Sequence, residues 1–261
     1  MDRRREPLPT RVEDLPALPA AYERALAAGL ASLGLVLDAA ARAAIAGHVR
    51  LLLAWNRAIN LTAIVDPERI ATLHVVDSLT AVPLVATRRG PPRLLDLGSG
   101  GGFPGLPLAT AVPGSTVLLV ESIGKKARFL EAAVAATDLG TRVAVAAVRA
   151  EALAEEVRAG RLAPFDVLTA RAVGSLPELV RLAFPLLVPG GRLVAWKRGD
   201  MTAEIDAAVR AAAAFGGARV RSRATTAPGL EGHVLIVVEP VKPARLGRTQ
   251  PAPSGRSSRL A

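Results

Sequence analysis

Apolar residues in the first third of the chain recur at helical spacing. An alanine- and leucine-rich segment at residues 20–33 stops before Gly34, which predicts a first helix. Asp38 is a good N-cap residue for a second helix. Its apolar residues, three or four positions apart, share one face, and they are Ile45, Val49, Leu52, Trp55 and Ile59. This stripe predicts a helix that packs on a core.

A third helix is expected after Asp66, which can cap it, with Pro67 at the first helical position. It would run through residues 69–84. We therefore expect a small N-terminal helical cap over residues 19–90. An Arg- and Pro-rich segment with little periodicity precedes it, so residues 1–18 are interpreted as a mobile arm.

From Arg93 onward, short apolar runs alternate with helical segments, which is typical of an α/β protein with a doubly wound sheet. We expect a Rossmann-like domain over residues 91–240. The expected strands are 94–97, 116–121, 143–148, 165–169 and 192–197, closed by an antiparallel pair at 218–225 and 233–239. The expected helices are 125–139, 151–158, 177–187 and 201–215. Residues 241–261 gain Pro, Gly, Ser and Arg, and we expect a disordered basic tail there.

The first strand runs directly into a glycine-rich turn, Gly98-Ser-Gly-Gly-Gly-Phe-Pro-Gly. Glycines permit positive φ and let the backbone approach a ligand closely, and Pro104 stands where a helix can begin. A strand, a glycine turn and a helix in this order bind nucleotide-like ligands at the carboxyl end of the strand.

Asp96 distinguishes between the possible ligands. Gly100, Gly102 and Gly105 satisfy the dinucleotide pattern G-x-G-x-x-G, but that match is weak alone. A carboxylate just before the turn repels a pyrophosphate and attracts the cationic amino acid of S-adenosylmethionine, so we favour that cofactor over NAD. Asp96 as a buried support of the turn remains an equal alternative. Glu121, about twenty residues further on, stands where an acid accepts hydrogen bonds from ribose hydroxyls.

Composition narrows the functional class. The formal net charge is +10, and the segment after Pro240 holds five basic and no acidic residues. This favours a polyanionic partner, although a solvated basic surface fits equally well. The absence of cysteine excludes disulfides and thiolate metal sites, and we expect no bound metal. With no membrane-length apolar run and no signal-peptide pattern at the start, we expect a cytoplasmic protein with no membrane partner.

Several motifs together identify a family. The turn Leu187-Val-Pro-Gly-Gly-Arg-Leu and the acid-led glycine loop resemble class I S-adenosylmethionine-dependent methyltransferases. The other motifs are Asn60-Leu61-Thr62, His74-x-x-Asp77-Ser78-Leu79, Ser122-Ile-Gly-Lys125-Lys126-x-x-Phe129-Leu130, Arg171-Ala-x-x-Ser175-Leu and Lys197-x-Gly199. With the glycine loop, they resemble the bacterial ribosomal RNA small-subunit methyltransferase G family, also called glucose-inhibited division protein B. The resemblance covers about residues 51–199.

The resemblance implies methylation of guanine N7 in small-subunit ribosomal RNA, with S-adenosylmethionine as donor. It adds to Asp96 and Gly100 a set of cofactor residues: Gly98, Phe103, Glu121 at the ribose, Ala150 and Glu151 at the adenine, and Arg171. Arg171 and Lys197 are the expected catalytic residues. His74, Lys125 and Lys126 are expected at the RNA, and capping of the cofactor loop is a second possible role for His74. The expected partner is small-subunit ribosomal RNA or the 30S subunit, with the protein acting as a monomer.

Guanine N7 carries a lone pair and no proton, so its methylation needs alignment and charge placement rather than a general base. The scarcity of histidine agrees with this, and we expect His48 and His233 to serve packing or the surface. Simple structural roles also remain open for Arg171 as a salt bridge and for Lys125, Lys126 and Lys197 as solvated lysines. The candidates for stacking on a flipped base are Phe103, Trp196 and Trp55, with core packing as the alternative.

Three other functions are compatible with parts of the pattern. One keeps the cofactor and changes the substrate to a small molecule or a protein. A second is an RNA-binding module without activity. A third is an NAD(P)-dependent reductase that uses the pattern beginning at Gly100.

Overall fold

The computed structural model describes residues 8–87 and 90–241, and its centre is a seven-stranded sheet in the order β3-β2-β1-β4-β5-β7-β6. Strands β1 to β5 run parallel, and β7 is antiparallel to both β5 and β6. The strands are β1 (Arg93–Leu97), β2 (Thr116–Val120), β3 (Val143–Ala146), β4 (Phe165–Arg171), β5 (Leu187–Arg198), β6 (Ala218–Ala224) and β7 (His233–Pro240). The doubly wound sheet and its closing antiparallel pair are confirmed.

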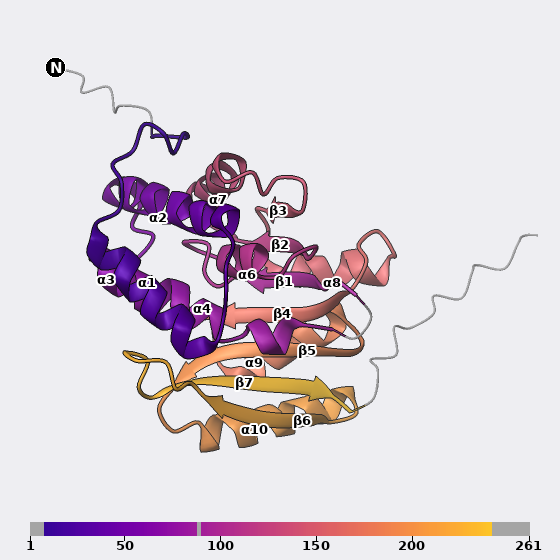
Figure 1. The fold of residues 1–261 in the computed structure, drawn as a ribbon. Coiled ribbons are helices and arrows are strands. Elements are labelled where there is room, and N and C mark those ends of the chain that lie inside the picture. Colours follow the sequence, from indigo (N-terminus) through magenta and orange to yellow (C-terminus); the bar gives the residue numbers. More distant parts are fainter. Residues whose placement is uncertain (1–7, 88–89, 242–261) are drawn as a thin grey trace, which may run out of the picture.

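Helices cover both faces of this sheet (Figure 1). The helices that follow the strands are α6 (Gly105–Ala111), α7 (Gly124–Ala136), α8 (Ala150–Arg158), α9 (Leu176–Ala183) and α10 (Thr202–Ala212). Successive strand residues point to opposite faces. Leu94 therefore packs in the cluster with α6, α7 and the N-terminal helices, whereas Leu95 and Leu97 pack in the cluster with α8, α9 and α10.

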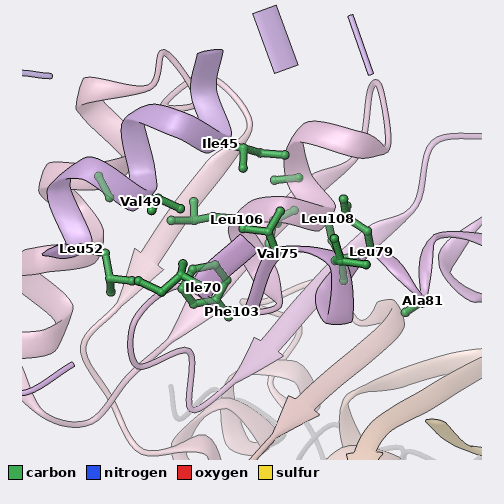
Figure 2. Packing of buried hydrophobic residues seen from close by; sticks show 14 of the residues in the cluster. Ile45, Val49, Leu52, Ile70, Val75, Leu79, Ala81, Phe103, Leu106 and Leu108 are labelled. Carbon is green, nitrogen blue, oxygen red and sulfur yellow. The ribbon is translucent and has the colours of Figure 1, made fainter. Parts of the chain in front are cut away.

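The N-terminal helices lie against the α6 and α7 side of the sheet (Figure 1). They are α1 (Ala20–Leu33), α2 (Ala39–Ile59), α3 (Pro67–Ile70), the π-helical turn η1 (Ala71–Val76), α4 (Asp77–Leu79) and α5 (Val82–Val85). Figure 2 shows Ile45, Val49 and Leu52 of α2 together with Leu106 and Leu108 of α6 in one buried cluster. The apolar stripe predicted for α2 is thus part of the core. No described helix has both the length and the apolar character needed to cross a bilayer.

The third predicted helix is not continuous. Residues 69–84 form α3, η1 and α4, followed by a turn at Thr80 and Ala81 and by the short helix α5. Pro83 lies in the first turn of α5, and proline disfavours helix in the residue before it and supplies no N–H to the preceding turn. A π-helical turn within a helix often marks a functional site. Here it carries His74 and is followed directly by Asp77.

Two further expectations need correction. The turn predicted at 188–191 lies within β5, where the pairing with β4 passes from Phe165 and Leu187 to Val167 and Arg192. It is a bulge rather than a break, because β5 pairs with β4 on both sides of it. Gly190 adopts a φ of 82° there, which glycine tolerates.

Residues 8–18 are ordered against α2, in contrast to the mobile arm expected there. The Trp55 indole Nε1 donates to the Pro9 carbonyl at 2.7 Å, and Arg50 Nε donates to the Pro16 carbonyl at 2.9 Å. Apolar residues spaced along this Pro-rich segment pack on the core, namely Leu8, Val12, Leu15 and Leu18. The remainder of the expected arm, residues 1–7, and the expected tail after Val241 lie outside the described residues.

The contact between α1 and η1 gives a stability prediction. A Cβ at Gly29 would lie 2.3 Å from Val76 Cγ2. Glycine inside a helix costs about 0.5–1 kcal/mol relative to alanine, so helix propensity alone would make Gly29→Ala stabilising. Overpacking a core costs about 1–3 kcal/mol. We therefore expect Gly29→Ala to lower the free energy of unfolding in urea by about 1 kcal/mol, the difference between these two effects.

Two variants serve as controls for this prediction. Gly29→Ala/Val76→Ala lacks the Val76 methyl groups that would clash with the new Cβ. Its free energy of unfolding should therefore not be lower than that of Val76→Ala. Gly124→Ala at the start of α7, where a Cβ would meet no atom within 4 Å, should not destabilise the protein. A Gly29→Ala protein more stable than the parent would contradict this close packing of α1 on η1.

Candidate active site

A cavity of about 600 Å³ opens at the carboxyl edge of the parallel strands, between the N-terminal helices and the sheet. Its volume is within the range of ligand pockets. The wall residues come from the segment after α2, from α3 and η1, from the glycine loop and from the ends of β4 and β5. The polar, aromatic and loop residues of the wall include Thr62, Arg69, His74, Asp77, Gly98, Gly100, Phe103, Lys126, Arg171, Trp196, Lys197, Arg198 and His233.

The glycine loop follows β1 and forms the floor of this cavity. Gly98 and Gly100 have φ values of 65° and 52°, in the left-handed region that favours glycine. A Cβ at Gly98 would lie 2.5 Å from Val173 Cγ2, so the loop also passes closely over the segment after β4. The Gly100 backbone N–H donates to Glu121 Oε2 at 3.0 Å. The loop is thus tied to the end of β2.

Asp96 lies beneath the loop and is 1% exposed. Its Oδ1 accepts a hydrogen bond from Thr169 Oγ1 at 2.7 Å, and its Oδ2 accepts one from the Gly105 backbone N–H at 3.2 Å. Burial raises the pKa of Asp96 to about 6, and the hydrogen bonds oppose this shift. Of the two alternatives left open by the sequence, this geometry fits the buried support of the turn, because the carboxylate faces the protein interior.

Glu121 follows β2 and is 6% exposed. Besides Gly100, the Ile123 backbone N–H donates to its carboxylate, to Oε1 at 2.8 Å. Ala150 and Glu151 begin α8, which follows β3 at the same edge of the sheet, and Glu151 is exposed. These three residues are not among those that line the cavity, and they lie further along the edge beyond the glycine loop.

Arg171, the last residue of β4, contacts the N-terminal helices directly. Its Nη1 lies 3.1 Å from Asp77 Oδ2 and donates to the Leu73 carbonyl at 3.1 Å. Burial lowers the pKa of Arg171, and the Asp77 carboxylate opposes that shift. The guanidinium carbon also lies 5.3 Å from the centre of the Phe103 ring. Arg171 is therefore held between the end of the sheet, the π-helical turn and the glycine loop.

Asp77 lies at the centre of the polar contacts, a position that sequence reasoning did not assign to it. Besides Arg171, its carboxylate contacts His233, with Nδ1 of the ring 3.0 Å from Asp77 Oδ1. The Trp196 indole N–H donates to the Asp77 carbonyl at 2.8 Å. His233, expected to serve packing or the surface, instead lines the cavity. The one signal available was Asp77 itself, an acid of the family motif within the predicted third helix.

His74 is a neutral part of the cavity wall. His74 Nδ1 lies 3.2 Å from Arg171 Nη2 and 3.2 Å from the Leu73 carbonyl oxygen. Because a guanidinium can only donate and carries a positive charge, we assign Nδ1 as its acceptor, and Nε2 then donates to Thr62 Oγ1 at 2.7 Å. Burial, together with the charge of Arg171, lowers the pKa of His74 to about 3. Its ring stacks on that of Phe103, with ring centroids 4.9 Å apart.

His48 also supports the glycine loop. It lies on the apolar face of α2 and is 2% exposed. Its Nε2 donates to the Gly101 carbonyl at 2.7 Å, and its ring centroid lies 4.6 Å from that of Phe103. Burial lowers the pKa of His48 to about 4, so the ring is neutral at pH 7. The expected packing role is confirmed, but the sequence did not connect this histidine with the glycine loop.

The cavity wall is rich in basic residues. Lys126 lines it, whereas Lys125 is exposed and is not part of the lining. Lys197 Nζ donates to Glu204 Oε1 at 2.7 Å and to the Gly174 carbonyl at 3.0 Å, so its ammonium group is engaged within the protein. Sequence reasoning missed two further basic residues of the lining, Arg69 and Arg198.

Of the three aromatic candidates for stacking on a flipped base, two line the cavity and one does not. Phe103 and Trp196 line the cavity, and each is 6% exposed. Trp55 lies on α2, where its indole N–H holds the segment before α1, and it is not part of the cavity lining.

Comparison with known proteins decides the family. Residues 42–228 match the family model described as rRNA small subunit methyltransferase G. The chain belongs to that family. It is 49% identical over 180 residues to the ribosomal RNA small subunit methyltransferase G of Stenotrophomonas maltophilia (strain K279a), covering 69% of this chain and 79% of the relative. It is 41% identical to that of Roseiflexus castenholzii over 212 residues, covering 81% and 88%.

A solved structure with the same fold is the O-methyltransferase from Bacillus cereus in complex with SAH. It has a TM-score of 0.54 and 20% sequence identity, and the match covers 74% of this chain and 90% of that one. The family resemblance and the methyltransferase fold expected from the sequence are thus confirmed.

The buried carboxyl group beneath the loop gives a pH prediction. The pKa of an aspartate is ordinarily 3.8, and that of Asp96 is about 6 in the folded protein, so the folded state binds more protons than the unfolded state between these values. The free energy of unfolding therefore falls as the pH rises through this window. Relative to Asp96→Asn, which cannot titrate, the wild-type protein should lose up to roughly 3 kcal/mol between about pH 4 and pH 6.5.

This difference is measured by urea unfolding of both proteins at a series of pH values. His48 and His74 have lowered pKa values and give a slope of the opposite sign, but they are present in both proteins and cancel in the difference. A constant offset from the lost hydrogen bonds does not affect the slope. Two parallel stability curves would show that Asp96 does not titrate in this window.

Proposed function

We propose that this protein transfers a methyl group from S-adenosylmethionine to N7 of a guanine in small-subunit ribosomal RNA. The observation that carries the proposal is the glycine loop, whose Gly98 and Gly100 have left-handed φ values and line a cavity with basic walls. The chain that contains this loop belongs to the rRNA small subunit methyltransferase G family. A basic wall suits a polyanionic substrate. We also propose that the protein acts as a monomer in the cytoplasm, where ribosomal subunits assemble.

The residues around the loop fit an adenosyl cofactor. Each oxygen of Glu121 accepts one backbone N–H, and a carboxylate oxygen has a second lone pair, so both can accept from ribose hydroxyls. Gly98 and Gly100 lack the side chains that would keep a ligand from the backbone. Ala150 and Glu151, past the next strand, would flank the adenine. Asp96 shapes the loop from below.

The chemistry requires alignment. The bound cofactor supplies an electrophilic methyl group on a sulfonium, and guanine N7 supplies a lone pair without a proton. Arg171 is fixed by Asp77 and His74, and it can orient the base edge or a phosphate through its remaining donors. Phe103 and Trp196 bound the space for the base. Lys197 is a positioning residue in this scheme, because its ammonium group holds the segment after β4 to α10.

The residues proposed to contact RNA fall into two groups, those that line the cavity and those outside it. Lys126, Arg69 and Arg198 reach the cavity and would contact phosphates at its mouth. Lys125 is exposed beside them and would contact the RNA outside the cavity. His74 would act through Arg171, since its Nδ1 lone pair already accepts from the guanidinium.

The loop assignment is tested by Gly98→Asp. The aspartate would meet Val173 and strain a left-handed position, so methyl transfer to small-subunit RNA and the thermal shift caused by S-adenosylmethionine should both be lost. Gly34→Asp is the matched control, because Gly34 has the same φ of 65° and no atom within 4 Å of an added Cβ. Full activity of Gly98→Asp would count against the cofactor site.

The same assays separate the alternatives. Mass analysis of digested RNA should find 7-methylguanosine, and a methyl group on another atom would refute the N7 assignment. Stabilisation by NADH and not by S-adenosylmethionine would favour a reductase.

Arg171→Ala should lower the rate of methyl transfer at least tenfold, which corresponds to about 1.4 kcal/mol of transition-state stabilisation, because a contact that orients the substrate is lost. Arg192→Ala is a matched control. Arg192 also lies on the central strands and donates to a backbone carbonyl, that of Leu84, but at the opposite edge of the sheet. Equal losses in both variants would indicate a purely structural role for Arg171.

A further inference from the structure

The edge strand β6 carries a row of arginines. Arg219, Arg221 and Arg223 alternate with other residues, and all three are exposed. Alternate residues of a strand share one face, so these side chains stand about 7 Å apart in a row about 14 Å long. We call these three residues the β6 arginine row.

The pairing with β7 shows which face the row occupies. Arg223 is opposite Leu235, and Leu235 is in turn opposite Trp196 of β5. Paired residues of neighbouring strands point to the same face. The row therefore lies on the face that carries Trp196 and the N-terminal helices, whereas α10 packs on the other face of β6 (Figure 1).

The row begins beside the cavity. His233, which lines the cavity, lies on the same face of β7 two residues before Leu235, the partner of Arg223. The separation between Arg223 and His233 is about one strand spacing and two residue steps. Arg198, also of the lining, is opposite His233 on β5. Basic residues thus continue from the cavity mouth outward along the edge of the sheet.

The charge of the row is only partly compensated. Arg221 Nη2 pairs with Glu239 Oε2 at 2.9 Å. Within the described residues, Arg219 and Arg223 form no ion pair. Charged side chains on an edge strand also prevent edge-to-edge association of sheets, which is the alternative explanation for the row. Protection of the edge requires charged side chains on β6, but it does not require that the basic residues continue from the cavity to the β6 arginine row.

We propose that the β6 arginine row binds the phosphates of the RNA strand that leaves the cavity. The proposal rests on the proposed function and names a contact surface outside the cavity itself. Three guanidinium groups at regular spacing, of which those of Arg219 and Arg223 form no ion pair within the described residues, favour a chain of phosphates over a single small anion. Phosphate contacts position an RNA without reading its bases. The row sets affinity for RNA, and the reaction at the bound guanine proceeds without it.

The test compares RNA binding by Arg219→Gln/Arg223→Gln with that of the wild-type protein. The probe is purified small-subunit ribosomal RNA in a filter-binding assay over a series of KCl concentrations. Two lost phosphate contacts should weaken binding about tenfold and reduce the slope of log K against log salt by roughly 1.4. The KM for RNA should rise while kcat and the thermal shift with S-adenosylmethionine stay at wild-type values.

Two further variants control for charge alone. Arg181→Gln/Arg210→Gln removes the same charge from exposed positions on α9 and α10, the helices on the opposite face, and should leave RNA affinity within twofold of wild type. Glu239→Gln frees Arg221 from its partner and should tighten RNA binding severalfold. Edge protection alone predicts no change in affinity from Glu239→Gln.

Failure of this proposal and failure of the proposed function give different results. Wild-type protein that neither binds nor methylates small-subunit RNA overturns the function. Wild-type protein that does both, with unchanged affinity in Arg219→Gln/Arg223→Gln and in Glu239→Gln, overturns the surface alone. Should the double variant fail to fold, the outcome of Glu239→Gln still decides.

Discussion

The ion pair between Asp77 and Arg171 is the interaction on which the arrangement of the site depends. It joins the end of the central strand β4 to the helix that follows the π-helical turn, and the Asp77 side chain is only 4% exposed. Removing one partner of a buried pair leaves an uncompensated charge and typically costs about 3–5 kcal/mol. The pair therefore fixes the N-terminal helices against the sheet in one position, which defines the cavity between them.

The other polar contacts of the wall follow from that position. With Arg171 held, its guanidinium donates to His74 Nδ1. Burial, together with the charge of Arg171, keeps the His74 ring neutral where it stacks on Phe103. His48 also packs on this phenyl ring, and its Nε2 donates to the Gly101 carbonyl. Phe103, packed against two neutral histidines, thus transmits the position of the helices to the glycine loop.

Local patterns in the sequence sufficed for the sheet, because strand burial, glycine turns and helix caps are each determined by residues close together in the chain. The floor of the cavity could be predicted for the same reason. The contacts of Asp77 could not, since Arg171 lies 94 residues away and His233 lies 156 residues away. The role of His48 was hidden in the same way, because a histidine within an apolar helical stripe gives no sign of the loop it supports.

Three carboxylates near the site are engaged within the protein, and this affects what the cavity can attract. Asp77 is balanced by Arg171 and contacted by His233, Asp96 lies beneath the loop, and Glu121 accepts two backbone N–H groups. The basic residues at the mouth have no comparable compensation from these acids. An approaching ligand therefore meets a positive potential, which raises the association rate of a polyanion such as RNA and gives small neutral molecules no advantage.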